Sequence, residues 1–272
     1  MTVVDNLPTN APSQGHAGVS IALAARHYPE IAVGGFSRVD WAILFWSQVA
    51  ALLRPDHRVL DFGAGRGEHI LDDPVAYRRD LATLKGRCRE VVGCDVSEAV
   101  LSNPFLDSAD ILDPRGTLPY PSNSFDMIVS RFVFEHLADP ARVAAELVRV
   151  LKPGGWLCVV TPNKWGYVAL GARLVPNRLH ARALGRVQPG RKAEDVFPTL
   201  YRLNSPADLR RHFGHACDVH SFRLSGDPAY HFGSPLLYGL FRTAHALLPA
   251  ALQTAICAFI RKRPEPSAPQ SS

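Results

Sequence analysis

One stretch of the chain combines residue types and spacing that could bind a small ligand. Residues 59–70 read Val-Leu-Asp-Phe-Gly-Ala-Gly-Arg-Gly-Glu-His-Ile, so an apolar run ends in Asp61 and continues into Gly63, Gly65 and Gly67. Apolar positions then return at helical spacing, which predicts a buried strand, a glycine turn and the start of a helix. Glycines let the backbone adopt unusual angles and let a ligand approach closely. Helix-start amides also favour an anionic group.

The spacing of these glycines argues against a dinucleotide site. In the pattern Gly-x-Gly-x-x-Gly, the third glycine would fall on Glu68 when counted from Gly63 and on Ile70 when counted from Gly65. The motif present is Asp-x-Gly-x-Gly-x-Gly. A glycine turn without function remains the alternative, because short glycine motifs are common.

A second candidate lies at the end of the apolar segment 90–95. Its last residue, Asp95, stands where nucleotide-binding βαβ units place an acid that accepts hydrogen bonds from ribose hydroxyls. A carboxylate suits a vicinal diol because each oxygen can accept one bond. Val96 follows directly and would border the same ligand. Helix capping is the alternative role, but Ser97 and Glu98 give the next helix its own start signals, so Asp95 is freer to bind a ligand.

Two further motifs follow in order and define a family resemblance. Residues 122–137 combine a polar turn, Phe-Asp, an apolar strand and Glu-His, and residues 149–155 read Arg-Val-Leu-Lys-Pro-Gly-Gly. With the glycine motif, they resemble the class I S-adenosylmethionine-dependent methyltransferases, of the methyltransferase type 11-like kind. The similarity covers roughly 56–163, and a weaker one covers 205–262.

The resemblance implies a fold and a cofactor. The expected fold is α/β, a Rossmann-like seven-stranded sheet that is mostly parallel with an antiparallel last strand. Helices would cover both faces, and an insertion would follow strand 5. S-adenosylmethionine would lie across the strand ends, in agreement with the general rule for open α/β sheets, and would leave as S-adenosylhomocysteine. No His/Asp/Glu cluster has metal-ligand spacing, so no metal is expected.

The resemblance also implies a set of site residues. The expected cofactor-binding residues are Asp61, Gly63, Gly65, Gly67, Asp95, Val96, Asp113, Ser130 and Arg131. Asp113 would meet the adenine amino group after the third strand, with Asp110 as its competitor. Ser130 and Arg131 follow the fourth strand, near the expected position of the methyl group. Arg131 is less usual there and could be a pocket residue or a surface ion-pair partner.

Some reactions of this class need a base that removes a hydroxyl proton. His136 is the first catalytic candidate, since an unperturbed imidazole titrates near neutral pH. A structural histidine in the Glu-His turn is the competing interpretation. His180, His212, His215 and His231 are further, unranked candidates.

Alternation of strand and helix patterns surrounds these motifs and predicts a parallel sheet with crossover helices. Strands are expected over residues 58–62, 90–95, 109–112, 125–130, 156–161, 219–224 and 256–262. Helices are expected over residues 20–33, 38–54, 75–86, 140–151, 205–213 and 235–253. Asp139 and Ser205 should cap two of these helices, each followed by a proline.

The expected domain organisation is one large unit with two appendages. Residues 1–37 form an N-terminal arm and a short helix, 38–262 a single methyltransferase domain, and 263–272 a flexible tail. Residues 164–204 lack a clear period and are expected to be an insertion that covers the substrate. A buried helix is preferred for 235–253 over an amphipathic lid or a peripheral membrane contact.

Composition limits the partners and the compartment. The chain has 272 residues, 47% hydrophobic and 20% charged, with a net charge of +5. Its basic residues are scattered, which argues against nucleic-acid binding. Five cysteines without a Cys-x-x-Cys pair fit a reducing compartment. The N-terminus has no signal-peptide pattern, so a cytoplasmic location is expected, with membrane-peripheral contact through 235–253 as an option.

These observations predict methyl transfer to a small organic acceptor, with oxygen of a lipid-linked, saccharide or secondary-metabolite substrate preferred. A protein or RNA methyltransferase is less favoured, because Ser-Arg-Phe-Val stands at 130–133 where an Asn/Asp-Pro-Pro-Tyr motif would follow the fourth strand. A non-catalytic binding or scaffold subunit with the same fold is the alternative from another class. The fold alone cannot choose between them.

Overall fold

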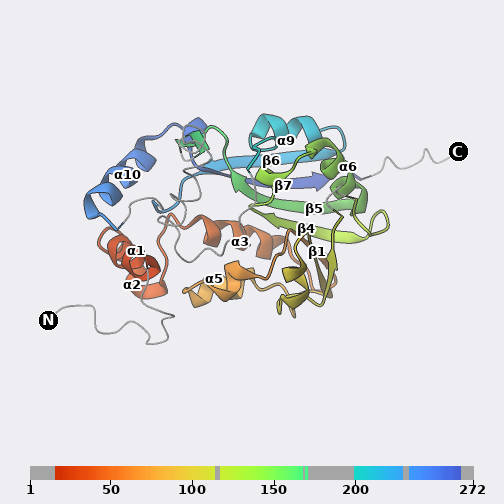
Figure 1. Ribbon diagram of the computed structural model, residues 1–272, viewed down its shortest axis with the longest axis horizontal. Helices are drawn as coiled ribbons and strands as arrows, with labels where there is room; N and C mark the ends of the chain where they lie inside the picture. The colour runs from red at the N-terminus through yellow and green to blue at the C-terminus, as the bar shows by residue number, and fades with distance from the viewer. Residues whose placement is uncertain (1–15, 114–116, 168, 171–198, 229–232, 265–272) are drawn as a thin grey trace, which may run out of the picture.

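A seven-stranded sheet forms the centre of the molecule (Figure 1). The computed structural model describes residues 16–113, 117–167, 169–170, 199–228 and 233–264. The strand order is β3-β2-β1-β4-β5-β7-β6. The strands are β1 (Arg58–Phe62), β2 (Glu90–Asp95), β3 (Ser108–Ile111), β4 (Phe125–Arg131), β5 (Leu151–Pro162), β6 (Cys217–Leu224) and β7 (Ala255–Lys262). The strands from β3 to β5 pair in parallel, whereas β7 is antiparallel to both β5 and β6. The predicted sheet is therefore confirmed.

Side-chain alternation along the strands divides the core into two layers. Leu60 and Ile128 face α6 (Pro140–Val150) and α9 (Pro206–Phe213). Val59 and Val129 face the opposite way, toward α3 (Trp41–Leu52) and α5 (Ala76–Ala82). Figure 1 shows α6 and α9 on one side of the sheet and α3 and α5 on the other. Helices on both faces of a mostly parallel sheet are thus confirmed.

Shorter elements connect these layers. They are α4 (Glu68–Leu71), η1 (Glu98–Ser102), η2 (Phe134–His136) and η4 (Ala250–Leu252). The first of them follows the glycine turn directly, and the third follows β4. Both therefore start at the carboxyl edge of the sheet, where ligands bind in open α/β folds.

β5 begins earlier than the sequence predicts. The pattern at residues 152–155 predicts a helix stop, but β5 begins at Leu151, directly after α6. Phe125 pairs with Leu151 and Met127 with Trp156, so the register shifts between these two pairs. Extra residues on one strand of a pair form a bulge. Lys-Pro-Gly-Gly therefore ends the helix and also belongs to an irregular strand.

The single helix predicted over 20–33 is wrong, because two helices occupy this region. α1 (His16–Ala25) ends before Tyr28-Pro29, and α2 (Ile31–Gly34) follows. The physical reason is Pro29, since the residue before a proline is pushed out of the helical region of backbone space. α2 then ends at Gly35, which adopts a φ of 81°.

α10 (Pro235–Leu247) corrects the expectation of a buried helix over 235–253. Tyr238 is its buried residue, whereas Leu236, Leu240 and Leu247 are 81%, 60% and 78% exposed. In Figure 1 this helix lies with α1 and α2 at one end of the molecule. Tyr238 joins a small cluster with α1 and α2 residues rather than the main core, which explains why most of its apolar face is uncovered.

Several sequence expectations fall outside the described residues. These are the N-terminal arm up to residue 15, residues 171–198 of the predicted insertion, the tail from 265, and the candidates His180 and His231. Within the described ranges, no helix has the length and apolar character needed to cross a membrane.

Among the described residues, side-chain caps start four α-helices, and Ser97 caps η1. Asp139 accepts a hydrogen bond from the Arg142 amide, and Ser205 accepts one from the Asp208 amide, as predicted. Ser234 caps α10 in the same way. Asp40 caps α3 by accepting from two amides at 3.0 and 3.2 Å. This last cap has a second role, because the other carboxylate oxygen pairs with the Arg78 guanidinium.

We expect Asp40→Ala to lower the free energy of unfolding by about 1–2 kcal/mol, because an N-cap is lost. Asp40→Asn keeps an oxygen that can accept from the α3 amides and should lose clearly less. Urea denaturation of both variants and the wild type measures the difference. Equal losses in the two variants would mean that the ion pair, and not the cap, carries the effect.

Candidate cofactor and acceptor site

The turn between β1 and α4 depends on glycine. Gly63, Gly65 and Gly67 adopt φ values of 79°, 47° and 76°, which L-residues with side chains rarely adopt. A Cβ on Gly63 would lie 2.1 Å from the Val133 Cγ2 atom. A Cβ on Gly67 would lie 2.8 Å from the Asn103 Oδ1 atom. The turn is therefore both left-handed and closely packed by neighbouring segments.

Asp95 ties this turn to the end of β2. One carboxylate oxygen accepts the Gly65 amide at 2.9 Å, and the other accepts the Ser97 amide at 2.9 Å. Both oxygens of Asp95 therefore hold backbone amides, while Ser97 caps η1 as the sequence indicates. A carboxylate offers about four lone-pair sites. Asp95 can therefore position the turn and still accept hydrogen bonds from a ligand.

Two further predicted residues lie beside Asp95. Val96 follows it and is 46% exposed, which is high for a valine. The Leu112 amide donates to the Asp95 carbonyl at 2.7 Å, which places the exposed Asp113 one residue beyond this contact. Its competitor, Asp110, accepts a hydrogen bond from the Tyr120 hydroxyl at 2.9 Å. The structure therefore brings Asp113 to the same sheet edge and gives Asp110 a partner within the fold.

Asp61 and Arg131 share one face of the sheet. Asp61 is two residues beyond Val59 in β1, and Arg131 is two residues beyond Val129 in β4. Because strand side chains alternate, both point toward the layer that contains α3. Ser130 points to the opposite layer, where it is fully buried. The structure therefore does not bring the Ser130 side chain together with Arg131.

The pKa of Asp61 is raised to about 7, chiefly by burial; the charges of Glu68 and Asp95 add to the rise, and the charge of Arg131 opposes it. A carboxyl group with this pKa changes charge close to neutral pH. Carboxyl groups with such raised pKa values are concentrated at functional sites. The Asp that opens the glycine motif is thus a titratable group of the site.

Arg131 is a pocket residue and not a surface ion-pair partner. Its guanidinium lies 5.5 Å from the centre of the Trp41 ring and 5.4 Å from that of Phe132. Its Nε atom is buried and has no hydrogen-bond partner among the described residues. Desolvation lowers the pKa of Arg131 from its usual value. Phe132 has a φ of 53°, so the backbone adopts a rare left-handed conformation directly after the arginine.

A cavity of about 360 Å³ opens beside Arg131. Its lining residues come from the start of α3, from α4, from the α4–α5 connection, from α5, from the end of β4 and from the loop after β6. They are Asp40, Trp41, Ala42, Trp46, Glu68, His69, Asp72, Asp73, Pro74, Arg78, Arg131 and Asp227. Because α4 follows the glycine turn directly, this cavity adjoins the turn.

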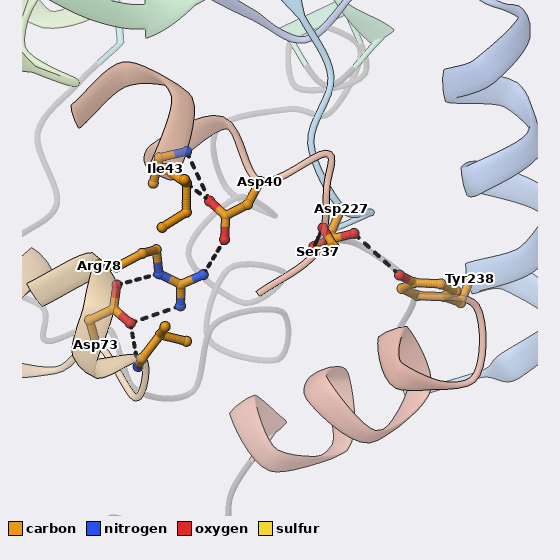
Figure 2. Close-up of polar contacts among 9 residues, drawn as sticks. Ser37, Asp40, Ile43, Asp73, Arg78, Asp227 and Tyr238 are labelled. Atoms are coloured by element: carbon orange, nitrogen blue, oxygen red, sulfur yellow. Dashed lines mark hydrogen bonds and ion pairs between the residues drawn. The ribbon is translucent and has the colours of Figure 1, made fainter. Parts of the chain in front are cut away.

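One wall of the cavity is an ion-pair network centred on Arg78 (Figure 2). The guanidinium donates to both carboxylate oxygens of Asp73, at 2.7 and 2.8 Å, and also to Asp40. Asp73 in addition accepts the Val75 amide at 2.8 Å. The positive charge of Arg78 is therefore fully engaged within the fold.

Asp227 closes the same wall from the loop after β6. It accepts hydrogen bonds from the Ser37 hydroxyl at 2.9 Å and from the Tyr238 hydroxyl at 3.5 Å (Figure 2). Burial raises its pKa. Segments before α3, after β6 and within α10 thus meet at one carboxyl group.

His69 provides an aromatic wall. Its ring stacks on Trp46 with the centroids 5.7 Å apart and the planes within 6°. Burial and the charge of Arg131 hold the pKa of His69 well below its usual value, so the imidazole is neutral at neutral pH. A flat apolar or aromatic group could lie against this pair.

His136 does not line the cavity. Its Nε2 atom lies 3.9 Å from a carboxylate oxygen of Glu135, which is buried and accepts a bond from the Thr161 hydroxyl. The Glu135 carbonyl also accepts the amides of Leu200 and Tyr201. This environment fits the structural interpretation of the Glu-His turn, while the catalytic role stays a prediction.

Sequence reasoning missed most of the cavity. His69 carried a signal, since it stands in the helix directly after the glycine turn. Asp40 carried another as the residue before an apolar helix. Arg78 and Asp227 carried none, because their contacts depend on how distant segments pack. In the part of the chain that the structure describes, no three His, Cys, Asp or Glu residues cluster as metal ligands.

Comparisons with known proteins point to one domain family. Residues 60–159 match the family model described as "Methyltransferase domain". Ubiquinone/menaquinone biosynthesis C-methyltransferase UbiE of Saccharophagus degradans is 28% identical over 162 residues, covering 54% of this chain and 59% of the relative. A "Probable S-adenosylmethionine-dependent methyltransferase" of Mycolicibacterium smegmatis is 32% identical over 133 residues, covering 48% and 47%. A solved structure of the YcgJ protein of Bacillus subtilis covers 82% of this chain and 99% of that chain, with 18% identity and a TM-score of 0.48.

Residues 60–159 therefore match a methyltransferase domain, in agreement with the family resemblance. The matched regions span about half to three-fifths of these curated relatives.

We expect Gly63→Ala to destabilise the fold more than Gly86→Ala. Both glycines have a φ near 80°, but a Cβ on Gly86 meets nothing within 4 Å. The shared backbone cost is about 1–2 kcal/mol, and the contact with Val133 should add about 1–3 kcal/mol at Gly63. Urea denaturation gives both values. In a Val133→Ala background, the additional destabilisation caused by Gly63→Ala should become much smaller. A double-mutant cycle that shows no coupling between positions 63 and 133 would refute the contact.

We expect Asp61 to make stability depend on pH. Because its pKa is higher in the folded state than in the unfolded state, folding takes up a proton between these values. The contribution is fully present below the unfolded pKa and is lost as pH rises to about 7. We therefore compare the unfolding free energies of the wild type and Asp61→Asn between about pH 4.5 and about pH 7.5, a range that brackets these pKa values. The value for the wild type minus the value for Asp61→Asn should fall as the pH rises. A flat difference would contradict the raised pKa.

Proposed function

We propose that this chain binds S-adenosylmethionine and transfers its methyl group to a small organic acceptor, releasing S-adenosylhomocysteine. The observation that carries the proposal is the link between Asp95 and the Gly65 amide. It holds an acid suited to a ribose diol beside a left-handed glycine turn at the carboxyl ends of β1 and β2. The methyltransferase domain match supports the same cofactor.

The residues present suit such a cofactor. The glycine turn lacks side chains where a ligand must approach closely, and Asp95 keeps acceptor capacity beyond its two backbone bonds. The cofactor-binding set stays a prediction: Asp61, Gly63, Gly65, Gly67, Asp95, Val96, Asp113, Ser130 and Arg131. Of these, Ser130 lacks support from its side chain, which is buried on the other face of β4.

The chemistry asked of the protein is modest. When bound, the cofactor supplies a methyl group already activated by a positively charged sulfonium. The chain has to hold an acceptor in line with that methyl, and positioning contributes several kcal/mol in such reactions. The cavity bounded by Trp41, His69 and Arg131 is the proposed place for the acceptor, because it adjoins the glycine turn.

The acceptor atom is a finer proposal. We propose oxygen of a lipid-linked, saccharide or secondary-metabolite substrate, with His136 as the candidate base where a hydroxyl proton must leave. The UbiE relative is named for methylation at carbon, so carbon is the competing acceptor. Mass and NMR analysis of a methylated product would decide between them.

The proposed partner is a small molecule. For the protein itself we propose a cytoplasmic location and a peripheral membrane contact through residues 235–253. The exposed Leu236, Leu240 and Leu247 of α10 support such a contact, because they repeat at helical spacing. Nucleic-acid binding stays outside the proposal, in line with the scattered basic residues.

Calorimetric titration with S-adenosylmethionine, S-adenosylhomocysteine and NADH tests the cofactor. Micromolar binding of the first two and none of NADH is expected. We expect Asp95→Ala to weaken both by at least tenfold, about 1.4 kcal/mol, because it removes the ribose acceptor and loosens the turn.

Asp107→Ala is the matched control, since this aspartate accepts the Val91 amide near the opposite end of β2. It should bind the cofactor like the wild type. A folded wild-type protein that binds neither nucleoside would favour the scaffold alternative, and equal losses in the two variants would remove the ribose role from Asp95.

A further inference from the structure

Arg131 is a half-buried cation that the fold does not neutralise directly. No ion pair joins it to an acid within the described residues, and its Nε atom is buried without a hydrogen-bond partner. Arg78, the other arginine of the cavity, is by contrast engaged by Asp40 and Asp73. An uncompensated buried charge is costly in a protein. Arg131 is therefore placed to gain from an anion that enters from outside.

The surroundings of Arg131 fix its orientation. The guanidinium lies over the faces of Trp41 and Phe132, and those two rings meet edge to face with centroids 5.3 Å apart. Phe132, whose backbone has a left-handed conformation, donates a hydrogen bond from its amide to the Val160 carbonyl at 2.9 Å. A rare backbone conformation next to a charged pocket residue is the kind of strain found at functional sites.

The neighbouring charges select the type of anion. Asp61 and Glu68 act on Arg131 from a distance and favour its charge. Both would repel a doubly charged phosphate more strongly than a singly charged carboxylate. A guanidinium fork also matches a carboxylate in two parallel hydrogen bonds. The site therefore suits a carboxylate better than a phosphate.

We propose that Arg131 binds a ligand carboxylate in this cavity. Where the carboxylate belongs to the cofactor, the inference rests on the proposed function. Two ligands could bring that group: the amino-acid end of the cofactor, or an acidic acceptor lying against the Trp46–His69 stack. In the first case, Asp61 and Glu68 would also complement the ammonium group of the same amino-acid end. In the second, the preferred acceptors are aromatic acids.

The first arm of the test addresses the cofactor. S-adenosylhomocysteine is compared with its analogue lacking the carboxyl group, 5′-S-(3-aminopropyl)-5′-thioadenosine, on wild type, Arg131→Gln and Arg131→Lys. A cofactor carboxylate predicts at least a tenfold loss of S-adenosylhomocysteine affinity in Arg131→Gln, with the analogue changed less than twofold. Arg131→Lys keeps the charge and should lose less. Arg87→Gln, which removes an exposed arginine bonded to backbone carbonyls, is the control.

The second arm addresses the acceptor. Benzoate and its neutral counterpart benzamide are titrated into the protein with and without saturating S-adenosylhomocysteine, followed by ligand-observed NMR. An acceptor carboxylate predicts that benzoate binds the saturated wild type, that benzamide binds at least tenfold more weakly, and that Arg131→Gln removes the preference.

Stability separates a binding role from a structural one. Because its burial lacks a direct counter-charge, Arg131→Gln should leave the melting temperature of the unliganded protein unchanged or raised. A lowered melting temperature with unchanged ligand preferences in both arms would overturn the proposal. If Arg131→Gln does not fold, the same comparisons are made on Arg131→Lys. This variant should lose at least threefold in affinity for the ligand that carries the carboxylate. Absence of S-adenosylhomocysteine binding to the wild-type protein would refute the cofactor function. The titrations with benzoate and benzamide alone would then still test whether Arg131 binds a carboxylate.

Discussion

The hydrogen bond from the Gly65 amide to Asp95 is the contact on which the site depends. It fixes the turn after β1 against the end of β2, although the chain between them passes through α4 and α5. The turn can only take this path because its glycines adopt left-handed angles and leave room for Val133 and Asn103. Parallel strands end at one edge, so the same bond also sets where the Asp61 and Arg131 side chains can meet a ligand.

Charge is distributed unevenly around that edge. Arg78 has two carboxylate partners, and Asp227 is held by two hydroxyls, so these groups build the wall of the cavity. Arg131 has aromatic faces and distant acids instead. A satisfied network rigidifies a structure, whereas an unsatisfied buried charge is retained only where something else justifies its cost. The contrast between the two arginines is thus a physical distinction between scaffold and binding surface.

The sheet could be predicted from the sequence because local patterns determine it. β1 and β2 begin and end at the predicted residues, since apolar runs bounded by Asp61 and Asp95 leave little freedom. The error over 20–33 came from underrating Pro29, and the error over α10 came from treating an apolar helix as a buried one. Apolar spacing indicates which side of a helix could be buried, but it does not indicate what covers that side.

The cavity was beyond reach for a different reason. Its walls come from the residues before α3, from α5 and from the loop after β6, and their meeting depends on tertiary packing. The glycine motif and its acid are adjacent in the fold because a βαβ unit places them so, whatever the rest of the chain does. Arg131 could be located by its strand, but its lack of a direct ion pair emerges only from the packing of the surrounding segments. A family motif therefore predicts where a cofactor binds, whereas the chemistry of the acceptor depends on contacts that no local pattern contains.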